Sequence, residues 1–205
     1  VGQKFYKMVA DDMNIEILDV GYLGTRELNL ASDKKITTPD DLDGVKLRMP
    51  GSDAWLFLGN ALGADATPLA FGEVYTGLQT GTIDGQDNPL PTVKAVKFYE
   101  VTKQIVLTDH LVDAIFLSMA KGTYDDLSAE QQEKVQDAAA VATAYNNEKR
   151  IADEKSLVDF FKGEGLKVYA PDVAAFRKKV QDAYLESEFA QDWPDGIVDQ
   201  INAVK

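Results

Sequence analysis

The spacing of hydrophobic and polar positions changes several times along the chain, and each spacing predicts a different element. Residues 14–20 and 26–30 alternate between polar and apolar side chains, which is typical of half-buried strands. Apolar side chains surround most of the segment 52–62, which predicts a largely buried helix that ends at Gly63. Further helices are predicted over residues 3–12, 38–42, 72–80 and 173–184, and further strands over residues 45–49, 105–107, 114–119 and 166–169.

One helix is expected to be much longer than the others. Ser128 and Gln131 have the spacing of a capping box, in which each residue caps the backbone of the other at the start of a helix. Neither glycine nor proline occurs from there to Lys162, and apolar side chains recur every three or four residues. Such a helix is roughly 50 Å long, because each residue adds about 1.5 Å. That exceeds the diameter of one small domain, so we expect the helix to contact two lobes.

Strands alternate with helices throughout, and this order is typical of an α/β protein with mostly parallel sheets. No internal repeat, low-complexity tract or proline-rich linker divides the chain into separate domains. If there are two lobes, the chain must pass between them through its own helices and strands. This organisation favours a hinged protein over independent domains joined by a linker.

Composition and charge narrow the class of protein. The 205 residues include 34 Asp or Glu and 21 Lys or Arg, which gives a formal charge of −13. Nucleic acid and anionic membrane surfaces are therefore poor partners. No uninterrupted apolar stretch approaches the roughly 18 residues that a membrane-spanning helix needs. Cysteine is absent, which excludes disulfides, thiol nucleophiles and zinc–thiolate sites. A chain without cysteine suits the periplasm, but many cytosolic proteins also lack cysteine.

Four residues between positions 26 and 88 are candidate ligand contacts, and each also has an ordinary structural interpretation. Arg48 stands near the end of a predicted strand, where a buried guanidinium needs a carboxylate or phosphate partner. That partner is either a ligand or an internal aspartate. If Arg26 does not contact a ligand, its position near the start of a strand is that of a surface arginine. In the same case Phe71 would be a core residue, and Asn88 would be a turn residue before a proline.

Three blocks of sequence together resemble a known family. The blocks are TTPDDLDGVKLRMPGS from Thr37, GADATPLAFGEVYTGLQTGTIDGQDNPL from Gly63 and KFYEV from Lys97. They look like the core of the DctP-type substrate-binding proteins of TRAP (tripartite ATP-independent periplasmic) transporters. The resemblance covers essentially the whole chain, which is similar to the later two thirds of such a receptor. Because the chain begins with Val1 and not with methionine, we expect a processed form or a fragment that lacks the signal peptide.

The resemblance assigns roles to the candidate residues by their positions in the motifs of the family. Arg48, in Gly-Val-Lys-Leu-Arg, corresponds to the arginine that clamps the carboxylate of the ligand. Arg26, in Gly-Thr-Arg, resembles a second ligand-facing arginine. Phe71 corresponds to an aromatic residue that can cover the apolar face of the ligand, and the amide of Asn88 can hydrogen-bond ligand hydroxyl groups.

The same resemblance implies that an acid and a histidine hold Arg48 in place, and these are Asp87 and His110 in this chain. Aspartate stands where the family usually has glutamate, so the supporting side chain is one methylene shorter. His110 is the only histidine, which excludes sites that need two. Its alternative interpretation is a surface or internally hydrogen-bonded histidine.

The resemblance further implies a two-lobed, periplasmic binding protein-like α/β fold, with the long helix spanning both lobes and the N-terminal part of the first lobe absent. Residues 24–113 and 154–180 would then form the second lobe. Residues 1–23, 114–153 and 181–205 would form the remainder of the first lobe.

The implied function is that of an extracytoplasmic receptor in the periplasm, which binds a small organic acid and delivers it to the membrane subunits of a TRAP permease. The ligand would be a sugar acid, a hydroxy or keto acid, or a C4-dicarboxylate. A sensor that presents its ligand to a signalling receptor, or an enzyme acting on organic acids, is the alternative. No catalytic residue, cofactor or metal is expected, because the sequence shows neither an activated nucleophile nor paired catalytic carboxylates.

Overall fold

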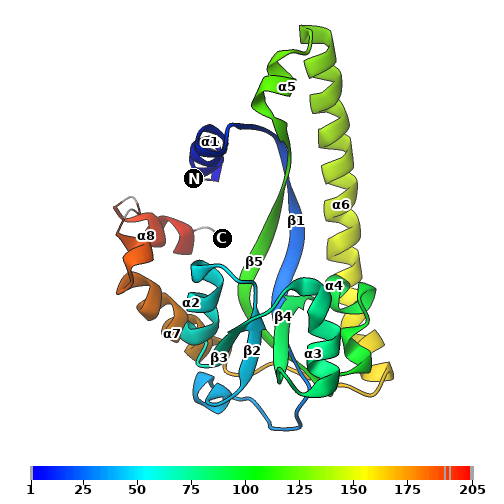
Figure 1. Ribbon diagram of the computed structural model, residues 1–205, viewed down its shortest axis with the longest axis vertical. Coiled ribbons are helices and arrows are strands. Elements are labelled where there is room, and N and C mark those ends of the chain that lie inside the picture. Colours follow the sequence, from blue (N-terminus) through cyan, green and yellow to red (C-terminus); the bar gives the residue numbers. More distant parts are fainter. Residues whose placement is uncertain (1, 192, 194, 204–205) are drawn as a thin grey trace. The chain divides into compact units, whose positions relative to one another are not determined.

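The protein is described by a computed structural model, which covers residues 2–191, 193 and 195–203. The chain folds into two compact units, each made from separate stretches of sequence. Within the described residues, unit 1 contains 2–23, 114–151, 193 and 195–203, and unit 2 contains 24–113 and 152–191. The long elements β1 (Ile15–Leu30), β5 (Gln104–Ala120) and α6 (Ala129–Gly163) contribute residues to both units (Figure 1).

The sheet of unit 2 has the strand order β3-β2-β4-β1-β5-β6. Besides β1 and β5, its strands are β2 (Lys46–Met49), β3 (Asp65–Pro68), β4 (Gly85–Pro89) and β6 (Lys167–Tyr169). β2 is parallel to both β3 and β4, and β5 is parallel to β6, as the alternation of strands and helices predicts. β1 differs because it runs antiparallel to β4, with Arg26 opposite Pro89.

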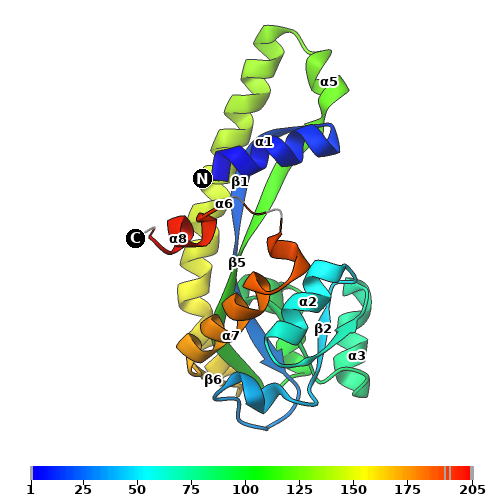
Figure 2. The same cartoon turned by 90° about the vertical axis from the view of Figure 1, so that its left-hand side faces the viewer.

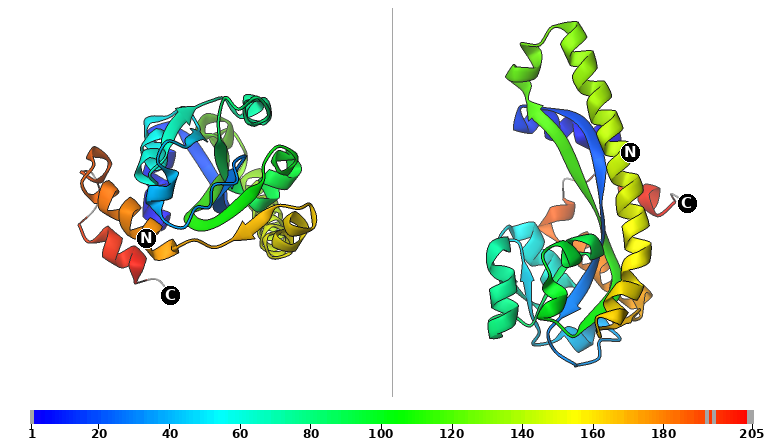
Figure 3. Two further views of the ribbon diagram at one scale, coloured as in Figure 1. Left: turned by 90° about the horizontal axis from the view of Figure 1, so that it is seen from below. Right: turned by 90° about the vertical axis from the view of Figure 1, so that its right-hand side faces the viewer.

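Helices cover both faces of this sheet, as Figure 3 shows for unit 2. On one face lie α2 (Asp53–Ala61) and α7 (Val173–Leu185), which contact each other (Figure 2). On the other face lie α3 (Val74–Thr80), α4 (Leu90–Ala95) and the C-terminal turns of α6. A separate buried cluster fills each side, one around Leu47 and Phe176 and the other around Phe98 and Phe161. Unit 2 is therefore a three-layer α/β structure.

Local signals in the sequence account for the ends of several elements. Gln131 N donates to Ser128 Oγ (3.3 Å) and Ser128 N donates to Gln131 Oε1 (2.9 Å), which confirms the predicted capping box. α6 then runs without a break to Gly163, as predicted. Gly81 ends α3 with φ +74°, a conformation that glycine adopts without strain. Short 3₁₀ helices occupy Pro39–Leu42, Phe71–Glu73, Phe98–Glu100 and Glu188–Ala190.

Unit 1 contains α1 (Gly2–Met13), α5 (Lys121–Asp125), α8 (Ile197–Asn202) and the unit 1 parts of β1, β5 and α6. Tyr6 packs edge-on against Phe116, with ring centroids 5.5 Å apart. Tyr22 N donates to Asn147 Oδ1 (2.7 Å) and Asn146 Nδ2 donates to Tyr22 O (2.9 Å), which joins β1 to α6. Within the described residues, no helix is long and apolar enough to cross a bilayer.

The structure differs from the sequence expectations in the number and extent of strands. The strands predicted at 14–20 and 26–30 are parts of the single strand β1, and those at 105–107 and 114–119 are parts of β5. The alternation is interrupted around Gly21 and Gly24 because glycine has no side chain, although the strand continues through both. The short elements β3, α4 and α5 were not predicted.

The two units also divide the chain differently from the predicted lobes near the C-terminus. Residues 181–191, predicted to belong with 1–23, lie in unit 2. The physical reason is aromatic packing, because the ring of Phe57 in α2 lies 4.7 Å from that of Tyr184 and 5.1 Å from that of Phe189. The assignment of the units to the first and second lobes of a receptor stays a prediction.

Candidate functional site

The predicted ligand-binding residues of unit 2 come together at one edge of the sheet. Arg48 and Asn88 each precede the last residue of a strand, β2 and β4 respectively. Phe71 follows β3, which runs in the same direction. Arg26 pairs with Pro89 because β1 is antiparallel to β4. The carboxyl ends of parallel strands in open α/β sheets are where such proteins commonly bind ligands.

The register divides these residues between the two faces of the sheet. Directly opposed residues share a face and successive residues alternate. Arg48 pairs with Gln86, and Asn88 therefore lies on the same face as Arg48. Asp87 pairs with Leu28, and Arg26 therefore lies on the same face as Asp87. Arg48 and Asp87 thus project from opposite faces.

Arg26 is buried and bound by two carboxylates. Its Nε donates to Asp87 Oδ2 (2.7 Å), and its Nη2 donates to the Asp87 backbone oxygen (2.7 Å) and to Oδ1 (3.2 Å). Its Nη1 donates to Asp113 Oδ2 (2.7 Å). The guanidinium carbon also lies 4.5 Å from the ring centroid of Trp55. Burial alone would lower the pKa of Arg26, but the two carboxylates outweigh burial and raise it.

A glycine allows β1 to approach its neighbours just before Arg26. A Cβ on Gly24 would lie 2.5 Å from Pro89 Cβ and 2.5 Å from Glu154 Oε1, and the φ of Gly24 is +140°. Thr25 N donates to the same Glu154 oxygen (2.7 Å), which fixes β1 against α6. These contacts set the position from which the Arg26 side chain begins.

The hydrogen-bonded support predicted for Arg48 belongs to Arg26 instead. Besides Arg26, the Asp87 carboxylate contacts His110, whose Nε2 lies 3.3 Å from Asp87 Oδ2 and whose Nδ1 lies 2.7 Å from Thr108 Oγ1. The prediction was wrong because strand alternation points Asp87 to the face opposite Arg48. Burial would raise the pKa of Asp87, but the His110 hydrogen bond and the Arg26 charge hold it at about 2. His110 is therefore hydrogen-bonded inside the protein, which agrees with its alternative interpretation.

Arg48 is buried along its stem but has no carboxylate partner in the described part of the chain. Its Nε donates to the backbone oxygen of Leu69 (2.8 Å), and its guanidinium carbon lies 5.7 Å from the ring centroid of Phe71. Burial lowers the pKa of Arg48; the charge of Asp87 opposes this, and repulsion from Arg26 adds to the lowering. The remaining N–H groups are available to an anion.

Asn88 is held by a chain of buried amides. Its Nδ2 donates to Gln86 Oε1 (2.6 Å), and Gln86 Nε2 donates to Asn29 Oδ1 (3.2 Å). Asn29 Nδ2 continues the chain to Thr102 Oγ1 (2.7 Å) and to the Gln104 backbone oxygen (3.1 Å). Such a network fixes the orientation of the Asn88 amide. Its Oδ1 has no hydrogen-bond partner among the described residues and remains an acceptor.

Phe71 is not a core residue, because 45% of its surface is exposed. One edge of its ring packs against Phe98, with centroids 5.9 Å apart. The ring is thus anchored on one side while its other surface is open beside Arg48. This arrangement suits an aromatic wall next to a cation.

Three further residues belong to this group and were missed as site residues. Gln86 orients Asn88, Asp113 binds Arg26, and Trp55 covers the guanidinium of Arg26. Trp55 was interpreted only as part of a buried helix. A useful signal for Asp113 was available, because an acid stands within the otherwise apolar segment Leu-Val-Asp-Ala-Ile-Phe of a strand.

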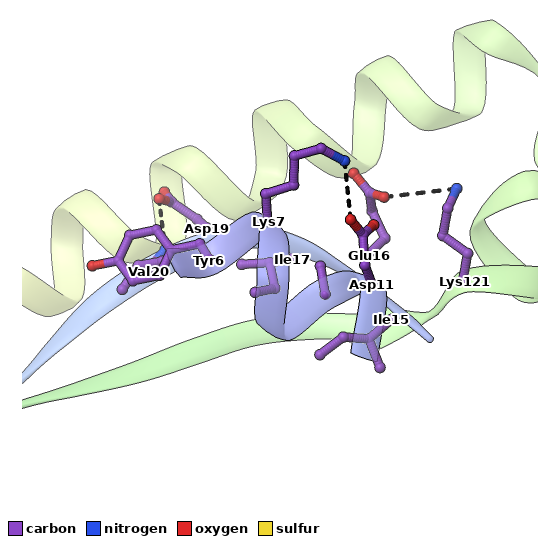
Figure 4. A pocket seen from close by; sticks show the side chains of 10 residues that line it. Tyr6, Lys7, Asp11, Ile15, Glu16, Ile17, Asp19, Val20 and Lys121 are labelled. Atoms are coloured by element: carbon purple, nitrogen blue, oxygen red, sulfur yellow. Dashed lines mark hydrogen bonds and ion pairs between the residues drawn. The ribbon is translucent and has the colours of Figure 1, made fainter. Parts of the chain in front are cut away.

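A cavity of about 380 Å³ lies in unit 1, but the residues that line it include no buried arginine comparable to Arg48 (Figure 4). Four of its five charged side chains form two pairs, Lys7 with Asp11 (3.1 Å) and Lys121 with Glu16 (3.8 Å). The side chains of these four residues are 30–77% exposed, so the charges are at least partly solvated. No group of three or more His, Asp or Glu side chains in the described residues is arranged to hold a metal ion.

Comparison with known proteins identifies the family. The model of the DctP family, described as bacterial extracellular solute-binding protein family 7, matches residues 1–191. This chain belongs to that family. A TRAP periplasmic solute-binding protein from Roseobacter denitrificans, solved with bound 3-deoxy-D-manno-oct-2-ulosonic acid (KDO), is 54% identical with a TM-score of 0.94. The match covers 99% of this chain and 68% of that chain.

Other relatives confirm the membership and the two-lobed α/β fold. A second R. denitrificans receptor, solved with bound L-galactonate, is 32% identical with a TM-score of 0.87, over 98% of this chain and 66% of that one. The sialic acid-binding periplasmic protein SiaP of Vibrio cholerae is 36% identical over 204 residues. That alignment covers 98% of this chain and 62% of SiaP, so the chain spans less than two thirds of this curated relative.

Proposed function

We propose that this protein is the periplasmic receptor of a TRAP transporter, that it binds a sugar acid through Arg48, and that it passes the ligand unchanged to the membrane permease. The observation that carries the proposal is the contrast between the two buried arginines. Arg26 is bound by two internal carboxylates, whereas Arg48 has none among the described residues. A buried guanidinium without an internal anion is suited to a carboxylate supplied by a ligand.

The geometry around Arg48 is suited to a carboxylate with hydroxyl groups attached. The bond from Nε to the Leu69 backbone oxygen orients the plane of the guanidinium, which leaves its Nη donors for a two-pronged contact. Phe71 borders this position and can cover carbon atoms of the ligand. Asn88 Oδ1 can accept a hydrogen bond from a hydroxyl group, because the amide nitrogen is already held by Gln86.

Relatives support a sugar acid and suggest which one to test first. The relative with 54% identity contains bound KDO, and others contain L-galactonate or β-D-galacturonate. Each of these molecules carries one carboxylate and several hydroxyl groups. KDO is therefore the first ligand to test.

Substitution of Arg48 tests the site. In the full-length receptor, Arg48→Ala removes the clamp, and we expect a loss of roughly 2–5 kcal/mol in KDO binding, or about 30-fold to several-thousand-fold in affinity. Arg48→Lys keeps the charge but loses the planar pair of donors, so its loss should be smaller but clear. Arg177→Ala is the matched control, because Arg177 is exposed on α7 of the same unit.

Isothermal titration calorimetry measures these affinities. If Arg48→Ala binds KDO within a factor of three of the parent, Arg48 is not the clamp. If the parent binds none of KDO, galactonate and galacturonate, the sugar-acid assignment is wrong. Mass spectrometry of the recovered ligand tests whether it is unchanged, and conversion to a product would favour an enzyme.

A further inference from the structure

Side chains on β5 stop alternating regularly next to Asp109. Val106 lies in the buried cluster that includes α7, and Leu107 packs against the cluster that includes α6, on the other face of the sheet. Regular alternation would return Leu111 to the face of Leu107. Instead, Leu111 packs against the cluster of Val106. The strand therefore contains a bulge, in which one extra residue shifts the alternation.

The backbone of Asp109 has a conformation typical of such a bulge. Its φ is +48°, in the left-handed region that residues other than glycine seldom adopt. β5 is nevertheless continuous on both sides of it, from Gln104 to Ala120. A residue in this conformation needs contacts that hold it there.

Glu27 supplies such a contact from the neighbouring strand β1. Its side chain is buried, and its Oε2 accepts a hydrogen bond from Asp109 N at 3.0 Å. The Asp109 side chain is a second hydrogen-bond partner of the Glu27 carboxyl group. Because Glu27 follows Arg26 directly in β1, the two side chains project from opposite faces of the sheet.

The bulge brings to Arg26 two side chains that a regular strand would separate. His110 Nε2 lies 3.3 Å from Asp87 Oδ2, and Asp113 Oδ2 accepts from Arg26 Nη1 at 2.7 Å. His110 and Asp113 are three positions apart, so they would project from opposite faces of a regular strand. Both lie on the face of Arg26 because the alternation shifts between them.

We propose that Glu27 is a positioning residue of the binding site, because it holds the bulge at Asp109 and the bulge arranges the side chains around Arg26. Its effect passes from the opposite face of the sheet through the backbone of β5. The consequence for ligand affinity rests on the proposed function and on the position of Arg26, which the sequence predicts to face the ligand. The consequence for His110 can be measured without a ligand.

Two substitutions of Glu27 test whether its hydrogen bonds hold the bulge. Glu27→Gln keeps an acceptor for Asp109 N and a donor for the Asp109 carboxylate, whereas Glu27→Ala keeps neither. His110 is the reporter, because its ring nitrogens contact Thr108 and Asp87. Its imidazole ¹⁵N signals are recorded by NMR in the ligand-free full-length receptor and are identified by their loss in His110→Gln. KDO affinity is then measured by calorimetry.

We expect Glu27→Gln to keep the parental imidazole signals and a KDO affinity close to that of the parent. Glu27→Ala should shift the signals clear of their parental positions. It should also weaken KDO binding about tenfold or more, which corresponds to one lost hydrogen bond to a charged group. Leu78→Ala, which removes a buried side chain from α3, is the control for lost stability and should change neither readout.

Asp109 provides a second test that does not require Glu27→Ala to fold. Asp109→Gly adopts a positive φ without strain and should keep the His110 signals, whereas Asp109→Val disfavours that conformation and should lose them.

The proposal fails if Glu27→Ala keeps the parental signals and affinity, or if Glu27→Gln loses them as Glu27→Ala does. It also fails if Asp109→Gly and Asp109→Val give the same His110 signals. If the parent binds no sugar acid, the proposed function fails instead, and the NMR comparison still decides whether Glu27 holds the bulge.

Discussion

Glu27 provides a test of how burial controls a charge in this fold. It projects from the face of β1 opposite Arg26 and is almost fully buried, with Oε2 accepting from Asp109 N at 3.0 Å. It lines a cavity of about 310 Å³ in unit 2 together with Asp109, Glu154 and Lys155. Burial raises the pKa of Glu27 from 4.5 to about 9; the hydrogen bond from Asp109 N opposes this rise, and the Asp109 carboxylate adds to it. Glu27 is therefore protonated at neutral pH.

The raised pKa makes stability depend on pH with a definite sign. Between pH 4.5 and about 9 the folded state holds a proton that the unfolded state has released. Folding stability attributable to Glu27 is therefore fully present below pH 4.5 and is lost as the pH rises through about 9. The slope is about 1.4 kcal/mol per pH unit, so raising the pH from 6 to 8 should cost roughly 2–3 kcal/mol.

Glu27→Gln removes this titration while keeping an acceptor for Asp109 N. Urea unfolding followed between pH 6 and pH 8.5 should show the parent losing stability with pH and the variant losing much less, so that the variant becomes the more stable protein at high pH. Glu73→Gln, which changes an exposed acid in the same unit, should keep the parental slope. Equal slopes for the parent and Glu27→Gln would refute the argument, because Glu27 would then be ionised at neutral pH.

Two further predictions concern the stability of unit 2. Asp87→Asn leaves Arg26 with one carboxylate in a buried position and should cost roughly 3–5 kcal/mol of unfolding free energy in urea; a loss below about 1 kcal/mol would mean that Asp113 alone satisfies Arg26. Gly85→Ala places a methyl group against the Leu30 side chain and the Asn29 backbone oxygen and should cost about 1–3 kcal/mol, whereas Gly122→Ala, where the space is open, should cost little. Equal thermal melting of the two alanine variants would contradict this.

Elements with strong local signals were predicted well. The capping box at Ser128 and the absence of glycine and proline sufficed for α6, because both act within a single helix. The extent of β1 was not predictable, because glycines interrupt its alternation and the strand is paired with β4 and β5, which are distant in the sequence. Sheet direction is also set by distant partners, which explains why the antiparallel position of β1 was missed.

The candidate site shows the same division between local and distant information. Motif positions brought Arg48, Phe71 and Asn88 to one edge of the sheet, but they did not say which acid binds which arginine. That pairing depends on the register, which places Arg48 opposite Gln86 and leaves Asp87 on the other face with Arg26. The contribution of Asp113 depends on β5 being long enough to bring it beside Arg26, which no local pattern indicates.

The order in which unit 2 is assembled from the chain has a consequence for folding kinetics. Leu28 of β1 lies in the same buried cluster as Phe176 of α7. Likewise, β5 pairs with β6 although the whole of α6 lies between these two strands in the sequence. About 150 residues separate the first pair, so a ribosome adding about 5–20 residues per second needs roughly 7–30 s to make the second partner after the first. During that interval α2 can cover its part of this sheet face, but the part that α7 covers lacks its partner. Contacts so distant in sequence also slow folding once the chain is complete. The protein is therefore expected to remain unfolded well after synthesis of its first strand, which leaves time for a chaperone or an export system to engage it.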